Sequence, residues 1–150
     1  MENTKIKIKI KKINPEAIIP HYAHDGDAGM DVYSCEDVLI NPDERKLIST
    51  GLTFEIPRGF EIQIRPKSGL ALNNGITILN TPGTLDSGYR GELKVILFNT
   101  SKNIYNVKKS EKIAQIILAR YEEAEIEETT ALTPTRRAEG GFGSTGLRKK

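Results

Sequence analysis

A short acidic turn and a glycine-rich tail contain most of the residues whose types could do chemistry. Residues 83–91 read GTLDSGYRG, so glycines and a serine bracket Asp86, and Tyr89 follows three residues later. A tight turn would hold Asp86 rigidly, and a carboxylate beside bound phosphates can orient a water molecule for attack. Tyr89 could then cover the face of a sugar. The plainer interpretations are a hairpin turn for Asp86 and a core aromatic residue for Tyr89.

The tail at residues 140–146 (GGFGSTG) combines four glycines with Phe142, Ser144 and Thr145. A backbone of this kind can turn its amide groups toward phosphate oxygens and bind them as an anion nest. It is not a Walker loop, because Leu147 follows the last glycine where that loop needs a lysine. A flexible tail is the alternative. Since nothing local can pack on Phe142, we expect its ring to dock on a base, a partner or the domain surface.

The segment at residues 67–75 (KSGLALNNG) predicts the one obvious helix, with Ser68 at or near its N-cap and Gly75 beyond its end. The Ser68 hydroxyl and the first free amides would form an anion site, and Arg65 and Lys67 would add positive charge. The alternative is an ordinary capped turn with two solvated cations.

Two polar residues stand inside apolar, strand-like runs, namely Asp31 in AGMD and Gln115 in IAQI. A buried polar side chain needs a hydrogen-bonding partner. One interpretation is that these residues hold the waters around a metal ion. The alternatives are a strand-entry turn for Asp31 and the outward face of an edge strand for Gln115.

The elements that would position these residues are mostly short strands. Isoleucine and lysine alternate through residues 5–11, which is the period of a half-buried strand. Five glutamates at residues 122–128 suggest a surface connection that leads into a mobile arm. This pattern predicts one all-β domain, either a sandwich, a barrel or a jelly roll. Further strands are expected at residues 31–34, 46–56, 60–65, 75–79, 92–99 and 113–121.

The composition narrows the class of protein. A chain of 150 residues suffices for a single core, and 22 basic against 20 acidic residues give no whole-chain field for nucleic acid or an anionic membrane. The single cysteine, Cys35, excludes an internal disulfide and a thiolate zinc cluster, and it favours a reducing compartment. No apolar stretch reaches the ~18 residues of a membrane span, so we expect a soluble protein that is not exported.

Five stretches in order, AGMD, KSGLA, GTLDSGYRG, IAQI and RxxGGFGSTG, resemble the motifs of the trimeric all-β deoxyuridine triphosphate nucleotidohydrolase (dUTPase) family. The resemblance implies a distorted jelly-roll or β-barrel-like fold with one short helix. Residues 1–132 would form the core domain, and residues 133–150 a flexible arm that closes over the active site. The implied activity is hydrolysis of dUTP to dUMP and pyrophosphate, which keeps uracil out of DNA and supplies dUMP for dTMP synthesis. The implied location is the cytoplasm, or the host-cell cytoplasm or nucleus for a viral protein.

The resemblance also implies roles for single residues. Asp86 matches the catalytic residue that orients and deprotonates the attacking water. Tyr89 matches the ring that packs on deoxyribose and disfavours a 2′-hydroxyl, and Asn80 matches a position in the hairpin that reads uracil. Phe142 matches the ring that stacks on uracil. The substrate-binding positions that match are Lys67, Ser68, Gly69, Asn80, Gly83, Thr84, Leu85, Tyr89, Gln115, Arg137, Phe142, Gly143, Ser144 and Thr145.

Asp31 matches the carboxylate that meets the metal indirectly, through water. The resemblance implies that the three phosphates and waters hold Mg²⁺ and that no protein cage does so. It implies in-line attack on the α-phosphorus and a homotrimer in which three subunits share each site. Lys67 and Lys112 stand where the family often has arginine. Because lysine lacks the bidentate fork of arginine, we expect somewhat weaker phosphate contact.

Three other functions compete with this one. A dCTP deaminase has a related fold but needs an added glutamate in its base pocket, whereas residues 80–86 resemble the uracil-reading form. A regulatory nucleotide-binding protein of the same fold would bind a protein partner. Asp86, Tyr89, Arg137 and Phe142 argue against a dead site, but they leave room for a second, regulatory role. A purely structural jelly roll gives no reason for the glycine-rich arm.

Overall fold

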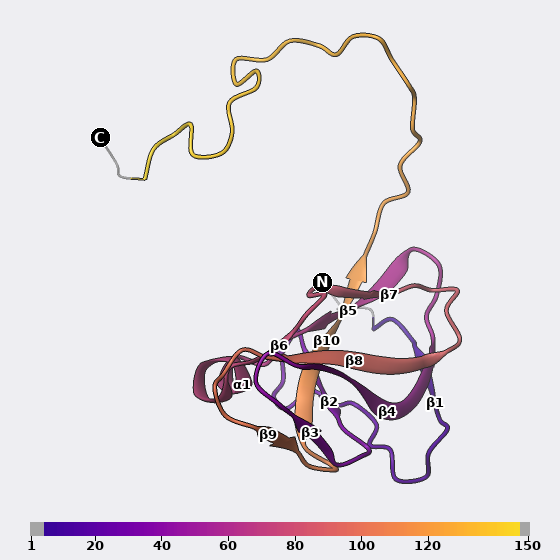
Figure 1. Cartoon of the computed structure of the whole chain (residues 1–150). Helices are drawn as coiled ribbons and strands as arrows, with labels where there is room; N and C mark the ends of the chain where they lie inside the picture. The colour runs from indigo at the N-terminus through magenta and orange to yellow at the C-terminus, as the bar shows by residue number, and fades with distance from the viewer. Residues whose placement is uncertain (1–4, 148–150) are drawn as a thin grey trace.

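Two four-stranded antiparallel sheets form the body of the protein in the computed structural model, which describes residues 5–147 (Figure 1). A two-stranded sheet and one short helix complete the body. This confirms the all-β fold class expected from the sequence. The elements are β1 (Lys9–Lys12), β2 (Met30–Tyr33), β3 (Val38–Ile40), β4 (Arg45–Glu55), β5 (Phe60–Arg65), α1 (Ser68–Asn74), β6 (Ile76–Ile78), β7 (Gly83–Leu85), β8 (Glu92–Asn99), β9 (Tyr105–Val107) and β10 (Lys112–Arg120).

The order of strands places successive elements in different sheets. One sheet has the order β1-β4-β8-β6, the second has the order β2-β10-β5-β7, and β3 pairs with β9. The chain therefore changes sheets between β6 and β7, and changes back between β7 and β8. Strands β6 and β7 each lie at an edge of their sheets.

The core lies between the inner faces of the sheets and follows from the alternation of apolar residues. In β5, Ile62 and Ile64 are buried, while Gln63 between them is half-buried on the other face. Burying each such side chain stabilises the fold by roughly 1.5–3 kcal/mol. Large side chains that are fully buried include Ile40, Ile48, Leu52, Ile62, Ile76, Ile78, Leu93, Leu97, Ile113 and Ile116.

The predicted strands agree with the structure except where they are very short. The first strand is regular only over Lys9–Lys12, although isoleucine and lysine alternate between half-buried and exposed from residue 5 onward, as expected. Strands β3, β7 and β9 were missed, and each has three residues. A run of three residues is too short to display a period of two, so pairing with a distant partner defines these strands.

The hairpin interpretation of the segment around Asp86 is wrong. Tyr89 N donates to Asp86 O at 3.1 Å and Thr81 N donates to Ile78 O at 3.2 Å, so residues 86–89 and residues 78–81 each form a β-turn. The strands on either side of each turn do not pair with each other, because they belong to different sheets. The chain therefore crosses from one sheet to the other at each turn, once before β7 and once after it.

The predicted helix is confirmed, with one change at its start. It spans Ser68–Asn74, and Gly75 ends it in the left-handed region at φ 65°. Lys67 occupies the N-cap position and makes no capping hydrogen bond from its side chain, so Ser68 is the first helical residue. No residue of the helix is buried. No helix among residues 5–147 is long and apolar enough to cross a membrane.

After β10 the chain leaves the body, as Figure 1 shows in orange and yellow. Hydrogen bonds hold the start of this segment against the turn between β4 and β5. There Tyr121 N donates to Gly59 O at 3.2 Å, and Arg58 Nη2 donates to both carboxylate oxygens of Glu123 at 2.9 and 3.0 Å. Nearly every described side chain beyond Glu123 is exposed. A division into a core ending at residue 132 and an arm beginning at residue 133 stays a prediction.

Candidate active site

A cavity of about 530 Å³ opens where the two turns cross between the sheets. Its volume lies within the range of small-molecule sites, about 300–1,000 Å³. The apolar part of its lining comes from both sheets and includes Leu47, Ile64, Ile78, Leu93, Val95 and Ile96. Six of the predicted site residues line it, namely Asn80, Gly83, Thr84, Leu85, Asp86 and Tyr89.

Strand β7 forms one wall of this cavity and is held close to β5. Gly83 pairs with Ile64, and a Cβ placed on Gly83 would lie 3.3 Å from Ile64 Cβ. Glycine at this position therefore lets the two strands approach. Because β7 is an edge strand, the backbone groups on its other side pair with no strand among residues 5–147 and are available to a ligand.

The turn after β7 presents Asp86 to the cavity. The Tyr89 N–H closes the turn on the Asp86 carbonyl, and Arg90 Nη1 braces it by donating to Ser87 O at 2.8 Å and to Tyr89 O at 3.0 Å. Within residues 5–147 no side chain or amide donates to the Asp86 carboxylate, which is exposed. The Asp86 carboxylate can therefore accept a hydrogen bond from a water molecule, orient that water and take its proton.

A second group of predicted residues lies on the outer face of the sheet that also contains β7. Asp31 on β2, Gln115 on β10 and Arg65 on β5 are cross-strand neighbours in one row. Residues opposite one another share a face of a sheet, and the adjacent row, Met30, Ile116 and Ile64, is buried in the core.

Asp31 is held between two lysines. Lys112 Nζ lies 2.8 Å from Asp31 Oδ2, and Lys67 Nζ donates to Asp31 Oδ1. Burial acts to raise the pKa of Asp31, but the two ammonium groups outweigh it and hold the pKa below its usual value. The hydrogen bond to Asp31 raises the pKa of Lys112 in turn. Asp31 is therefore an anion over a wide range of pH.

Gln115 lies in the middle of a sheet, so its interpretation as an edge-strand residue is wrong. Strand β10 runs between β2 and β5, and Gln115 Nε2 donates to Pro66 O at 2.9 Å. A Cβ on Gly29 would lie 2.6 Å from Gln115 Oε1, so a larger residue at position 29 would displace the amide. Asp31 is likewise the second residue of β2 and not part of an entry turn. Both side chains brace the approach to Ser68.

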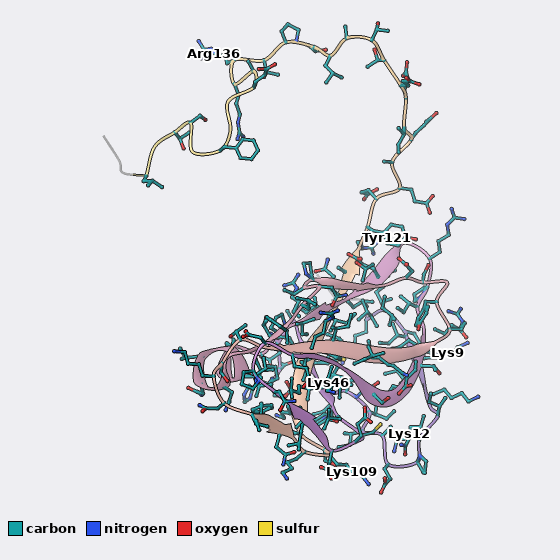
Figure 2. All side chains as sticks on the ribbon, viewed as in Figure 1. Lys9, Lys12, Lys46, Lys109, Tyr121 and Arg136 are labelled. Carbon is teal, nitrogen blue, oxygen red and sulfur yellow. The ribbon has the colours of Figure 1, made fainter. Side chains whose placement is uncertain are left out.

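The predicted residues of the arm lie apart from both groups. Figure 2 labels Tyr121 where the chain leaves the body and Arg136 far along the extended segment. The arm forms only local turns, in which Arg137 Nε donates to Gly140 O at 2.8 Å and Ser144 N donates to Gly141 O at 3.0 Å. Phe142 is fully exposed, so it does not dock on its own domain. Gly143 and Thr145 are exposed on the same segment.

The cavity also contains two charged residues that the sequence did not single out. Glu92 and Lys94 line it from β8, and their side chains lie 3.5 Å apart. Glu92 Oε1 also accepts from Gly51 N at 2.9 Å. In the sequence these residues resemble the ordinary exposed face of an alternating strand, so no pattern distinguishes them.

Comparison with known proteins assigns the chain to a family. The sequence model of the dUTPase family matches residues 15–146. The chain is 58% identical to a deoxyuridine 5′-triphosphate nucleotidohydrolase from Nautilia profundicola, over 94% of this chain and 99% of that protein. It is 56% identical to the protein of that name from Clostridioides difficile, over 93% and 98% of the two chains.

Solved structures agree with this assignment. A mutant Staphylococcus bacteriophage 80alpha dUTPase with dUpNHpp superposes with a TM-score of 0.83 at 25% identity, over 94% of this chain and 99% of that one. A mutant dUTPase of phage phi11, described as showing the coordination of a structural Mg(II) ion, has a TM-score of 0.79 at 21% identity, over 85% and 99% of the two chains. The motifs, the two-sheet body and these relatives together establish that the chain belongs to the dUTPase family.

Proposed function

We propose that this chain hydrolyses dUTP to dUMP and pyrophosphate. The observation that carries the proposal is the cavity of about 530 Å³, in which Asp86, Tyr89 and the open edge of β7 face one space. These are a carboxylate for water, a ring for a sugar, and backbone groups for a base. Membership of the dUTPase family supports the same assignment.

The base is read by backbone groups of β7 and the turn before it. The free edge of a strand offers alternating N–H and C=O groups, which can pair with the polar edge of uracil. Cytosine presents an amino group where uracil presents a carbonyl, so one pairing would fail. A buried polar group without its partner costs about 1–3 kcal/mol, and this penalty gives the discrimination. Asn80, in the turn at the same edge, completes this wall.

The sugar and the reacting phosphate lie next to the turn at residues 86–89. The Tyr89 ring packs on the deoxyribose and leaves no room for a 2′-hydroxyl. Asp86 orients a water molecule toward the α-phosphorus and takes its proton as the new P–O bond forms. Pyrophosphate leaves on the opposite side, which is the geometry of in-line displacement.

The triphosphate requires positive charge and amide donors, which the Ser68 region provides. The helix begins at Ser68, so its first amides, with those of Gly69, point outward without helical partners. Lys67 adds an ammonium group, although Asp31 already binds it. Gln115 holds the Pro66 carbonyl and so fixes the start of this segment. The incoming phosphates therefore compete with Asp31 for Lys67.

The residues present fit a magnesium ion that is held mainly by the substrate. Among residues 5–147 no three His, Cys, Asp or Glu side chains gather as metal ligands. Asp31 fits an indirect role, because each of its oxygens keeps a lone pair for a metal-bound water beyond its bond to lysine. When bound, Mg²⁺ supplies positive charge that stabilises the phosphates and the leaving pyrophosphate.

The complete site requires a homotrimer in this proposal. The support is that one subunit separates the three groups: the cavity opens between the sheets, the Asp31 group lies on an outer face, and the arm extends away from both (Figure 1). Residues 121–137 can span about 50 Å at ~3.3 Å per residue, enough to reach a neighbouring subunit. The arm then closes Arg137, Phe142, Ser144 and Thr145 over a bound nucleotide.

The activity is tested by measuring pyrophosphate release from dUTP, dCTP, dTTP and UTP, with Mg²⁺ and then with a chelator. We expect turnover of dUTP alone, lost with the chelator. Absence of dUTP turnover would refute the proposal, and ammonia release from dCTP would identify a deaminase. Asp86→Asn should still bind dUTP while its turnover falls by about 10²–10⁴-fold. Asp25→Asn, an exposed carboxylate outside the cavity, is the matched control.

Sharing of the site is tested by complementation. One variant carries Asp86→Asn and an intact arm, and the other keeps Asp86 but ends at residue 136. Each variant alone should be nearly inactive. If Asp86 and the arm come from different subunits, mixed trimers should recover a fraction of the wild-type turnover. No recovery after verified co-assembly would place Asp86 and the arm of one site in the same chain.

A further inference from the structure

The Tyr89 ring lies directly against the backbone of Gly91. A Cβ on Gly91 would sit 2.2 Å from Tyr89 Oη, 2.4 Å from Cζ and 3.0 Å from Cε2. The three atoms nearest to that Cβ therefore all belong to one ring. Gly91 does not have a left-handed φ, so the backbone conformation does not explain the glycine. The need for glycine comes from the ring alone.

Backbone carbonyl groups hold both the hydroxyl end of the Tyr89 ring and the Tyr89 main chain in place. The Tyr89 hydroxyl donates to Glu92 O at 3.2 Å, and the Tyr89 N–H donates to Asp86 O at 3.1 Å. The side chain is 47% exposed, and it lines the cavity with its open side. The ring therefore rests on the backbone of residues 89–92 and contributes its free side to the site.

We propose that Gly91 is a positioning residue that sets the discrimination between dUTP and UTP. It does so by letting the hydroxyl end of the Tyr89 ring lie against the backbone, which keeps the ring at a fixed distance from the sugar. The inference rests on the proposed function, in which Tyr89 packs on the deoxyribose. It adds that selectivity against the ribose depends on a residue that contacts no part of the nucleotide.

A methyl group at position 91 should move the ring and leave the fold intact. The clash falls on the far end of a half-exposed side chain, which can swing away at little cost. The ring would move off the backbone and break its hydrogen bond to Glu92. Its contact with the deoxyribose would then be lost, while UTP never makes that contact well. The preference for dUTP over UTP should therefore fall, because kcat/KM for dUTP decreases.

The test compares Gly91→Ala with Gly88→Ala in the same turn. A Cβ on Gly88 meets no atom within 4 Å, and Gly88 also lies outside the left-handed region, so this variant is the matched control. We expect kcat/KM for dUTP to fall about tenfold in Gly91→Ala. The value for UTP should change little, so the ratio of the two falls by a similar factor. Gly88→Ala should keep the wild-type ratio.

A double variant separates positioning from a general structural effect. In a Tyr89→Ala background the three nearest atoms are gone, so adding Gly91→Ala should change neither kcat/KM value. The proposal is overturned if Gly91→Ala keeps the wild-type dUTP to UTP ratio, if it unfolds, or if it has the same effect without the Tyr89 ring. Failure of the proposed function is a distinct result, because the wild-type protein itself would then not hydrolyse dUTP.

Discussion

Replacing Asn99 should destabilise the fold, and the hydrogen bonds of its side chain set the expected loss of stability. Its side chain is fully buried at the end of β8. The amide Nδ2 donates to Ile40 O at 2.9 Å and to Asn103 O at 2.8 Å. The Oδ1 atom accepts from the Ser101 amide at 2.9 Å and from its hydroxyl at 2.8 Å. Asn99→Asp preserves shape and acceptors but removes both donors.

The expected cost is the sum of two lost hydrogen bonds. The Ile40 carbonyl is in a buried residue, and losing a donor there costs about 1–3 kcal/mol. The Asn103 carbonyl belongs to an exposed residue that water can reach, so its loss costs only about 0.5–1.5 kcal/mol. At neutral pH the two carbonyl oxygens would also face a carboxylate. We expect a loss of about 2–4 kcal/mol, or roughly 4–16 °C in Tm for a chain of this length.

Thermal unfolding at one fixed protein concentration, at pH 7 and at pH 4.5, measures this effect. A buried carboxylic acid has a raised pKa, so the variant is protonated in the folded state at pH 4.5 and can donate one hydrogen bond again. The deficit in Tm should therefore be larger at pH 7 than at pH 4.5. Asn73→Asp, exposed on α1, should shift Tm little at either pH. A deficit for Asn99→Asp that is below 1 °C, or that grows toward pH 4.5, would refute the reasoning.

Three further predictions concern the backbone, the ion pairs and the arm. Gly51→Ala should destabilise the fold by about 2–4 kcal/mol in urea unfolding, because Gly51 has φ 70° and a Cβ there would lie 2.8 Å from Asn14 Cβ; a cost below 0.5 kcal/mol would contradict this. The Tm gap between wild type and Asp31→Asn should be constant from about pH 5 to 9 and close below about pH 4, since the lowered pKa of Asp31 loses its contribution only on protonation; a gap that persists at pH 2 would exclude the ion pairs as its cause. Deleting residues 137–150 should leave the far-UV circular dichroism and Tm unchanged while dUTP turnover falls, and unfolding on truncation would show that the arm supports the fold.

Local signals in the sequence predicted most of the regular structure. The alternation in residues 5–11, the long strands and Gly75 beyond the helix all reflect the geometry of neighbouring residues. The hairpin assignment of Asp86 failed because the sequence DSG specifies a turn but not the sheets that the flanking strands join. Strand β7 depends on its pairing with β5, some twenty residues away along the chain.

The site shows the same division between local and distant causes. The motifs identified Asp86, Tyr89 and Asp31 as chemically important, and the structure places Asp86 and Tyr89 in one cavity. The two lysines on Asp31 come from distant positions, and no periodicity connects Lys67 or Lys112 to it. Gln115 was ambiguous for a related reason, because only the neighbours of β10 decide whether it lies at an edge.

The shortness of β6 and β7 has a consequence for solubility. An enzyme that reads its ligand with an exposed strand edge also offers that edge to other polypeptides, which is a common route to aggregation. Strands β6 and β7 each have three residues, and Pro82, which lacks an N–H, directly precedes β7. A single base needs only a few pairing groups, whereas an invading strand needs a longer register to bind stably. In the proposed binding mode, an edge of this length would admit a nucleotide while protecting the protein from self-templated assembly.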